Sequence, residues 1–148
     1  MLNSIIFIKR GLSTISTCPG TKSMDAIKQW LSNFKGGSVR LSKCETTGFA
    51  SICLDNPDKK NALTGSMMCH LDDAVSELEQ WPLGRALLFY GTGGQFCSGG
   101  DLDFMRQIST PLEGRTMSTF MASITKRIAA LPLVSATLLE GTTLGGGT

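Results

Sequence analysis

The chain has 148 residues, with 14 basic and 12 acidic side chains and a formal net charge of +2. This near balance gives no electrostatic argument for a nucleic-acid partner or for binding to a charged membrane surface. With 41% hydrophobic and 18% charged residues, the composition excludes a disordered or collagen-like chain, and the length allows one domain with a sizeable core.

The first 24 residues form a segment without acidic side chains, in which Lys9, Arg10 and Lys22 stand among many hydroxyl residues. This composition is typical of a transit peptide, although a disordered tail without a targeting role fits it equally well. Its apolar run, residues 5–8, is far too short to span a bilayer, so we expect no membrane partner. Residues 1–24 are therefore treated as a leader or tail, and the fold is sought in residues 25–148.

The pattern over residues 25–54 predicts a helix followed by two strands. Apolar residues at helical spacing define one face of a helix over residues 25–34, and two glycines then end it. Apolar and polar residues alternate over residues 38–43, and a second apolar segment follows over residues 49–54, with a turn-like segment between them. Pro57 ends the second strand because proline cannot donate to the ladder.

The rest of the chain alternates helices and strands. Residues 64–81 and 111–131 carry apolar stripes at helical spacing. Residues 85–90 and 133–139 are apolar almost throughout, which is typical of strands that are buried on both faces of a parallel sheet. A hairpin followed by helix, strand, helix and strand predicts α/β architecture with right-handed crossovers.

A glycine-rich segment follows each of these two strands, over residues 91–100 and 141–147. Glycine turns can aim backbone N–H groups at a developing negative oxygen, and two sequential parallel strands would bring both turns to one edge of the sheet. An oxyanion hole is one interpretation, and two ordinary tight turns are the other. Neither segment has the glycine spacing of a dinucleotide or P-loop site.

Metal binding has few possible ligands in this sequence. There are five cysteines without a C-x-x-C pair, and His70 is the single histidine. We therefore expect reduced thiols and no metal site. His70 fits an ordinary position at the boundary of a helix, and Cys97 has no histidine near it in sequence to make it a nucleophile.

Three segments resemble the crotonase, or enoyl-CoA hydratase/isomerase, superfamily. They are residues 54–63 (LDNPDKKNAL), residues 96–102 (FCSGGDL) and the segment that runs from residue 131 to the glycine triplet at 145–147. Their order and spacing are those of the family. The resemblance covers residues 25–148 and implies the N-terminal part of a crotonase-like ββα spiral, truncated after the second glycine-rich oxyanion turn.

The resemblance also assigns roles to individual residues. It implies that the N–H groups of Gly100 and Gly146 are the two catalytic donors that hold the oxygen of a thioester enolate. It further implies that the CoA thioester contacts two segments, through Lys60, Ala62, Leu63, Ser98, Gly99, Asp101 and Leu102. Lys60 would meet a phosphate. Coenzyme A is then part of the substrate, and the resemblance implies no metal and no separate cofactor.

Within the family, residues 34–38 and 67–68 and the leader-like start favour decarboxylation of ethylmalonyl-CoA or methylmalonyl-CoA, a carboxy-lyase reaction of fatty acid metabolism. An enoyl-CoA hydratase or isomerase of fatty-acid oxidation is the alternative. Hydration needs an acid/base pair of glutamates, which family members place beyond the position of Thr148. Two departures stand out: Thr142 and Thr143 before the triplet, and Asp103 where some hydratases have a lysine.

The end of the chain and the resemblance lead to three further expectations. A strand and a glycine turn normally lead into a helix, yet the sequence stops at Thr148. We therefore expect an N-terminal fragment that is inactive alone, and a truncated non-catalytic product is a third functional alternative. The complete protein is expected to form a homo-oligomer, a trimer or a hexamer. The resemblance favours the cytosol, whereas the leader suggests the mitochondrial matrix.

Overall fold

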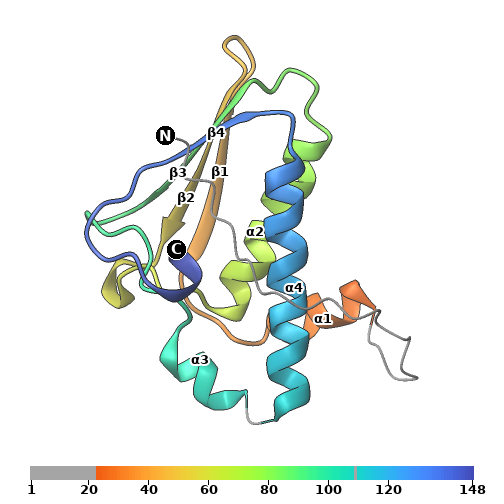
Figure 1. Ribbon diagram of the computed structural model, residues 1–148, viewed down its shortest axis with the longest axis vertical. Coiled ribbons are helices and arrows are strands. Elements are labelled where there is room, and N and C mark those ends of the chain that lie inside the picture. The colour runs from red at the N-terminus through yellow and green to blue at the C-terminus, as the bar shows by residue number, and fades with distance from the viewer. Residues whose placement is uncertain (1–22, 109) are drawn as a thin grey trace.

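The computed structural model describes residues 23–108 and 110–148, so most of the predicted leader, residues 1–22, lies outside the described residues. Its centre is a four-stranded sheet in the order β1-β2-β3-β4 (Figure 1). β1 (Ser38–Cys44) and β2 (Phe49–Asp55) form an antiparallel hairpin, and β3 (Ala86–Gly91) and β4 (Val134–Thr137) continue the sheet in parallel. The predicted α/β order is confirmed.

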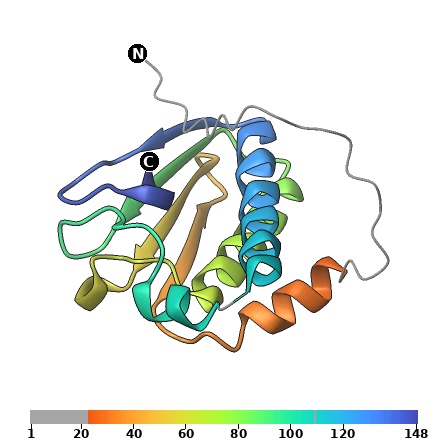
Figure 2. The same ribbon diagram turned by 60° about the horizontal axis from the view of Figure 1, so that its bottom comes forward.

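The two long helices lie on the same face of the sheet (Figure 2). α2 (Gly65–Glu79) connects β2 to β3 and packs against β1, while α4 (Pro111–Ala130) connects β3 to β4 and packs on α2. α1 (Met24–Leu31) contacts both of them, and α3 (Leu102–Gln107) is a short helix that the sequence analysis missed. None of the helices in residues 23–108 and 110–148 combines the length and hydrophobicity needed to cross a bilayer.

Both long helices begin at threonine caps that the sequence supplies. The Thr64 side chain accepts a hydrogen bond from the Met67 N–H, which satisfies one of the free donors in the first turn of α2. Thr110 and Glu113 form a reciprocal capping box, and Pro111 occupies the first turn of α4, where its missing N–H is not needed. These local caps thus fix the residues at which α2 and α4 begin.

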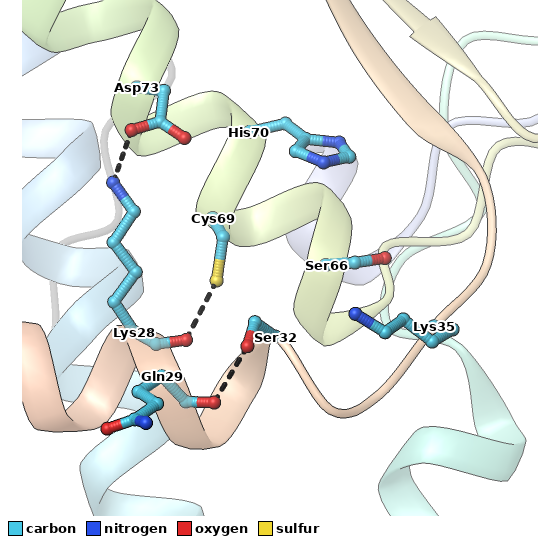
Figure 3. A pocket seen from close by; sticks show the side chains of 8 residues that line it. All are labelled: Lys28, Gln29, Ser32, Lys35, Ser66, Cys69, His70 and Asp73. Carbon is cyan, nitrogen blue, oxygen red and sulfur yellow. Dashed lines mark hydrogen bonds and ion pairs between the residues drawn. The ribbon is translucent and has the colours of Figure 1, made fainter.

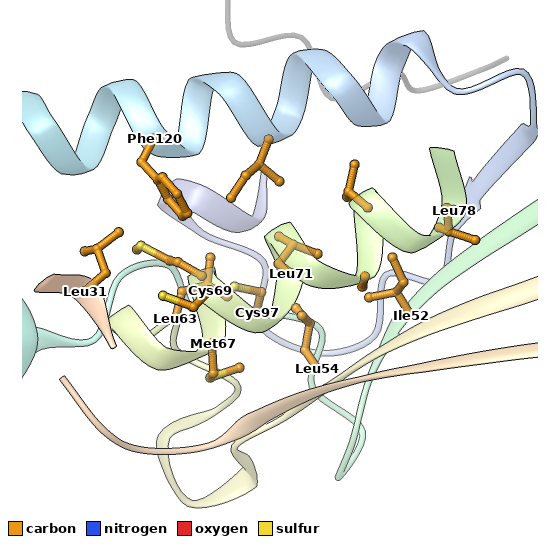
Figure 4. Close-up of a cluster of buried hydrophobic side chains, with 14 of the residues drawn as sticks. Leu31, Ile52, Leu54, Leu63, Met67, Cys69, Leu71, Leu78, Cys97 and Phe120 are labelled. Carbon is orange, nitrogen blue, oxygen red and sulfur yellow. The ribbon is translucent and has the colours of Figure 1, made fainter. Parts of the chain in front are cut away.

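The core lies between the sheet and α4, with α2 in the middle (Figure 4). Met67 and Leu71 of α2 are at most 6% exposed and meet the inner face of the sheet, where Ile52 of β2 is fully buried. Phe120 and Ile124 of α4 close the other side of α2, each at most 1% exposed. Burying a side chain of this size contributes about 1.5–3 kcal/mol, so α2 is held mainly by its position between two apolar layers.

The outer face of the sheet is partly exposed in the described residues, although the apolar runs of β3 and β4 are typical of strands that are buried on both faces. Leu87 of β3 faces inward and is 1% exposed, but its neighbour Leu88 is only partly buried. Val134 of β4 is 72% exposed, and Leu138, directly after the strand, is 46% exposed. The reason is that, in the described part of the chain, the long helices cover one face only (Figure 2). β4 is also shorter than the predicted 133–139.

A network of ion pairs joins α1, α2 and α4 outside the core. The Arg127 guanidinium of α4 binds both carboxylate oxygens of Glu79, at 2.8 and 2.7 Å. It also pairs with Asp72, which lies 2.7 Å from the Lys28 ammonium of α1. A bidentate guanidinium–carboxylate pair is stronger than an ordinary surface pair because two parallel hydrogen bonds fix its geometry. Arg127 therefore holds α4 to the polar side of α2.

Replacing Arg127 with Met should lower the free energy of unfolding of the full-length protein by about 1 kcal/mol at neutral pH. The hydrogen bond from Arg127 lowers the pKa of Glu79 below its ordinary value of 4.5. The stabilisation is therefore complete above about pH 4.5 and is lost as the pH falls through the lowered pKa. Urea unfolding at pH 7 and at pH 3.5 would measure it.

Lys126→Met serves as the matched control, because Lys126 is the exposed neighbour of Arg127 and forms no ion pair within the described residues. It should leave both unfolding curves almost unchanged. Equal destabilisation by the two variants would contradict the role given to Arg127.

Candidate active site at the carboxyl edge of the sheet

The candidate site lies where β2, β3 and β4 end. β2 is parallel to β3 and β3 to β4, so the segments that follow the three strands leave the sheet at the same edge. The first contains a 3-10 turn, η1 (Pro57–Lys59), and the last contains another, η2 (Gly145–Gly147). The C-terminal turn lies beside the loop that follows β3 (Figures 1 and 2). The edge predicted from the order of elements is therefore formed.

Backbone hydrogen bonds join the three segments to one another. The Leu63 N–H donates to the Gly99 carbonyl at 2.7 Å, and the Asp101 N–H donates to the Leu63 carbonyl at 2.9 Å. A second isolated parallel bridge joins Cys97 to Thr143. Residues 97–101 are therefore held on both sides, by the segment after β2 and by the segment after β4.

The N–H groups of Gly100 and Gly146 are left available by this pairing. Gly100 and Leu63 form an isolated parallel bridge, in which the neighbouring Asp101 donates its N–H to Leu63. Because successive residues of an extended segment point in opposite directions, the Gly100 N–H points away from Leu63. No acceptor in residues 23–108 or 110–148 takes a hydrogen bond from the Gly100 or Gly146 N–H. Gly100 is partly buried and Gly146 is exposed, so both donors can meet a ligand at this edge.

The two glycine turns contact each other closely. Gly99 has a φ of +99°, and a Cβ built on it would lie 3.1 Å from the Leu144 carbonyl oxygen and 3.6 Å from the Gly146 nitrogen. A Cβ on Gly147 would lie 2.7 Å from the Cys97 carbonyl oxygen. Glycine is needed at these two positions because the opposing turn of the same chain occupies the place of a side chain.

Gly99→Ala should therefore disturb the site by more than the backbone strain at residue 99 alone would do. Gly94→Ala is the matched control, because Gly94 has a φ of +67° and its Cβ would meet nothing within 4 Å. Both variants carry left-handed strain of about 1–2 kcal/mol, but only the one at Gly99 presses on the second turn. We expect Gly99→Ala to lower the rate of the reaction proposed below at least tenfold, while Gly94→Ala lowers only the melting temperature. Equal turnover in the two variants would show that the contact between Gly99 and the second turn does not matter for the site.

Asn61 is the main polar residue that holds these segments together. Its side chain is fully buried, and its backbone is left-handed with a φ of 55°. The Nδ2 group donates to the Thr92 carbonyl at 2.9 Å and to the Gln95 carbonyl at 2.6 Å. The Oδ1 atom accepts from the Asn56 N–H at 2.7 Å. One amide thereby joins the segment after β2 to the loop after β3.

Gln95 links that loop to the segment after β4. Its Oε1 atom accepts a hydrogen bond from the Thr142 N–H at 2.8 Å. Gly141, with a φ of +56°, leaves room for the Gln95 side chain, since a Cβ there would lie 2.4 Å from Nε2. The Phe96 N–H donates to the Glu140 carbonyl at 2.7 Å in the same region. Neither Asn61 nor Gln95 is identified as a site residue by the sequence patterns, although Asn61 stands out as a polar residue directly before the apolar pair Ala62 and Leu63.

Asp101 is buried beneath the first turn rather than open to solvent. Its Oδ1 atom accepts from the Phe104 N–H at 2.9 Å and so caps α3. Its Oδ2 atom lies 2.7 Å from the Lys59 ammonium, and its side chain is 5% exposed. Burial alone would raise the pKa of Asp101, but the hydrogen bonds from Lys59 and from the Phe104 N–H lower it below its ordinary value. The carboxylate is therefore ionised and internally bound.

The other predicted substrate-binding residues lie along the same edge. Lys60 is exposed and ends η1 with a left-handed backbone. Ala62 and Leu63 are buried, and Leu63 Cδ1 would lie 3.7 Å from a Cβ on Gly146. Ser98 donates its hydroxyl to the Lys59 carbonyl at 3.1 Å, and Leu102 is 70% exposed. The edge thus presents a cation, two free N–H groups and exposed apolar side chains.

The Cys97 thiol lies inside this arrangement, 1% exposed. Burial raises the pKa of the Cys97 thiol and outweighs the lowering effect of a hydrogen bond with the Gly99 backbone, so the thiol is protonated at neutral pH. Within residues 23–108 and 110–148, no group of three His, Cys, Asp or Glu side chains is placed to hold a metal ion. The expectation of a reaction without a metal remains a prediction.

A separate hollow lies between α1 and the start of α2 (Figure 3). Lys28, Lys35, Ser66, Cys69 and His70 are among the residues that line it. None of the glycine-turn residues contributes to it, and the Lys28 ammonium and the Cys69 thiol are already engaged, by Asp73 and by the Lys28 carbonyl. The chemistry of the chain therefore points to the sheet edge rather than to this hollow.

The fold and the edge together define an α/β protein with a ββα unit and a candidate ligand site at the carboxyl ends of parallel strands. The family model described as enoyl-CoA hydratase/isomerase matches residues 49–148. The chain belongs to this family, as its resemblance to the crotonase superfamily predicts. Curated relatives named ethylmalonyl-CoA decarboxylase include those of Xenopus tropicalis, 46% identical over 121 residues, and Mus musculus, 39% identical over 140 residues.

Solved structures agree with this assignment. Pseudomonas aeruginosa AtuE matches with a TM-score of 0.69 and 28% identity, covering 74% of this chain and 43% of that one. An enoyl-CoA hydratase from Thermoplasma volcanium matches with a TM-score of 0.66 and 28% identity, covering 74% of this chain and 42% of that one. The two curated relatives match over 82% and 95% of this chain, which spans 40% and 43% of their own lengths.

Proposed function

We propose that the full-length protein decarboxylates ethylmalonyl-CoA or methylmalonyl-CoA and stabilises the resulting enolate at the two glycine turns. The observation that carries the proposal is the pair of available N–H groups, Gly100 and Gly146, on two turns that contact each other at one edge of the sheet. Removing one such donor typically costs about 2.7–4 kcal/mol of transition-state stabilisation. The names of the relatives support the choice of reaction.

The chemistry fits what the edge offers. Breaking the bond between the α-carbon and the carboxylate releases CO2 and leaves its electron pair on the α-carbon, from where it delocalises onto the thioester oxygen. Two preorganised N–H groups can hold that oxygen, and one proton delivered to the α-carbon gives butyryl-CoA or propionyl-CoA. Decarboxylation thus needs stabilisation of one oxyanion and one proton donor, whereas hydration of a double bond needs an acid and a base.

The substrate is proposed to lie along the segment after β2 and the first turn. Lys60 is exposed and free to meet a CoA phosphate, because its ammonium forms no ion pair within the described residues. Ala62 and Leu63 give an apolar border, and the thioester arm passes Ser98, Gly99 and Leu102. Asp101 contributes by its backbone and by its support of the turn rather than by contact of its buried carboxylate.

Enoyl-CoA hydration or isomerisation is the second candidate, and the Thermoplasma volcanium structure, named an enoyl-CoA hydratase, favours it. The two candidates separate in one experiment. The purified full-length protein is given ethylmalonyl-CoA and crotonyl-CoA side by side, and the products are followed by mass spectrometry. Release of CO2 with formation of butyryl-CoA supports the proposal. Conversion of crotonyl-CoA alone would establish the second candidate instead.

The proposal extends to assembly and location. By its family resemblance the full-length protein forms a trimer or hexamer in the cytosol and uses acyl-CoA without a separate cofactor. Mass photometry tests the first point. Fusion of residues 1–24 to a fluorescent protein tests the second, since import into mitochondria would place the protein in the matrix.

A further inference from the structure

The environment of Asp101 depends on one cation. Asp101 directly follows Gly100 in the sequence, and its side chain is 5% exposed. Both carboxylate oxygens therefore need partners inside the protein. The Phe104 N–H satisfies one oxygen at 2.9 Å. Within residues 23–108 and 110–148, the Lys59 ammonium, at 2.7 Å, is the only cation that forms an ion pair with the other.

Lys59 reaches this carboxylate from a different segment of the edge. It closes η1, after β2, and its ammonium also lies 2.8 Å from Asp103 on α3. Two carboxylates thus engage Lys59, whereas its neighbour Lys60 is exposed and has no such partner in the described part of the chain. Both lysines are exposed, but only the Lys59 ammonium forms ion pairs in the described residues, so the two adjacent lysines differ in role.

Removal of the Lys59 charge would change the direction of the Gly100 N–H. A buried carboxylate oxygen without a partner must move toward water or take up a proton. The Asp101 N–H and the Gly99 carbonyl are both bonded to Leu63, so a shift of Asp101 rotates the short peptide segment held between these bonds. The Gly100 N–H lies in the middle of that segment.

We propose that Lys59 is a positioning residue: through Asp101 it couples the segment that binds coenzyme A to the orientation of the first oxyanion donor. This inference rests on the proposed function. Under this proposal Lys59 affects the rate of the chemical step, whereas Lys60 binds a phosphate of CoA. A misplacement of a reacting group by about 1 Å can cost up to a hundredfold in rate.

The test compares variants of the full-length protein. Lys59→Met should lower kcat for ethylmalonyl-CoA about tenfold or more, with KM changed less than twofold, when the variant is assayed well below its own melting temperature. Lys60→Met should raise KM instead. Asp101→Asn should resemble Lys59→Met in kcat, because an amide oxygen can still cap α3 but carries no charge, and Lys59→Arg should restore most of the rate. Arg106→Met is the control, since Arg106 pairs only with Asp103, at 3.2 Å, in the described residues.

Hydrogen exchange measured by mass spectrometry gives a readout that does not need turnover. Residues 99–107 should exchange faster in Lys59→Met than in the wild type or in Arg106→Met. A kcat within twofold of the wild type, or unchanged exchange over residues 99–107, would overturn the coupling. A wild-type protein that releases no CO2 would overturn the proposed function, and the exchange result would then still decide whether Lys59 holds the turn.

Discussion

Gly100→Pro is expected to abolish the proposed decarboxylation by the full-length protein while leaving most of its fold intact. Proline has no N–H, so the variant lacks the first donor to the enolate oxygen. The Gly100 N–H forms no hydrogen bond within the described residues, and its loss leaves no carbonyl there without a partner. We expect a fall in kcat of about a hundredfold or more, from the loss of one oxyanion donor.

Gly100→Ala is the matched control because it keeps the N–H. A Cβ at this position would lie 3.0 Å from the Met105 Cε atom, the far end of a flexible side chain that can move aside. We therefore expect a kcat far nearer to that of the wild type than that of Gly100→Pro. A proline variant with a normal circular dichroism spectrum and unchanged turnover would show that Gly100 is not an oxyanion donor.

Asn61→Asp should be the most destabilising single change in the site. The introduced carboxylate has the shape of the amide but cannot donate to the Thr92 and Gln95 carbonyls, which lie 2.9 and 2.6 Å from the Asn61 nitrogen. Asn61 is 0% exposed, so a negative charge would face two carbonyl oxygens without water. An uncompensated buried charge costs about 3–5 kcal/mol, and the loss should appear in urea unfolding at neutral pH.

Asn33→Asp is the control for this prediction. The Asn33 side chain also donates to two carbonyls, those of Gln29 and Trp30 at 3.3 and 3.2 Å, but Asn33 is exposed. Water can replace both bonds, so we expect a change within about 0.5 kcal/mol, as for ordinary surface substitutions. If the two variants lose the same stability, the burial of Asn61 is not what holds the segment after β2 to the loop after β3.

Sequence patterns predicted the elements of this fold because the long segments carry clear periodicity and strong stop signals. The stripe over residues 64–81 appears as α2 with Thr64 as its cap, and the capping pair of Thr110 and Glu113 begins α4 where the pattern places it. α3 was missed because it has six residues, too few to show a period, and depends on the Asp101 cap. The described residues leave the outer faces of β3 and β4 partly exposed, because an apolar run does not reveal which part of the chain covers it.

The site, like the fold, could be predicted from the sequence only in part. Glycine content and the order of elements were enough to expect two turns at one edge, and Gly99 and Gly147 meet the opposing turn as that expectation requires. The polar contacts between segments were not predictable, because they join residues far apart in the chain. Lys59 pairs with Asp101, and Asn61 bonds to the loop after β3, through geometry that only the assembled edge creates.

The central claim is that Gly100 and Gly146 together hold the oxygen of a CoA thioester. A crystal structure of the full-length protein with an unreactive CoA thioester analogue tests it most directly. We expect the thioester oxygen to lie about 3 Å from both backbone nitrogens, which is an ordinary hydrogen-bond distance. An oxygen bound elsewhere, or held by only one of the two N–H groups, would contradict it.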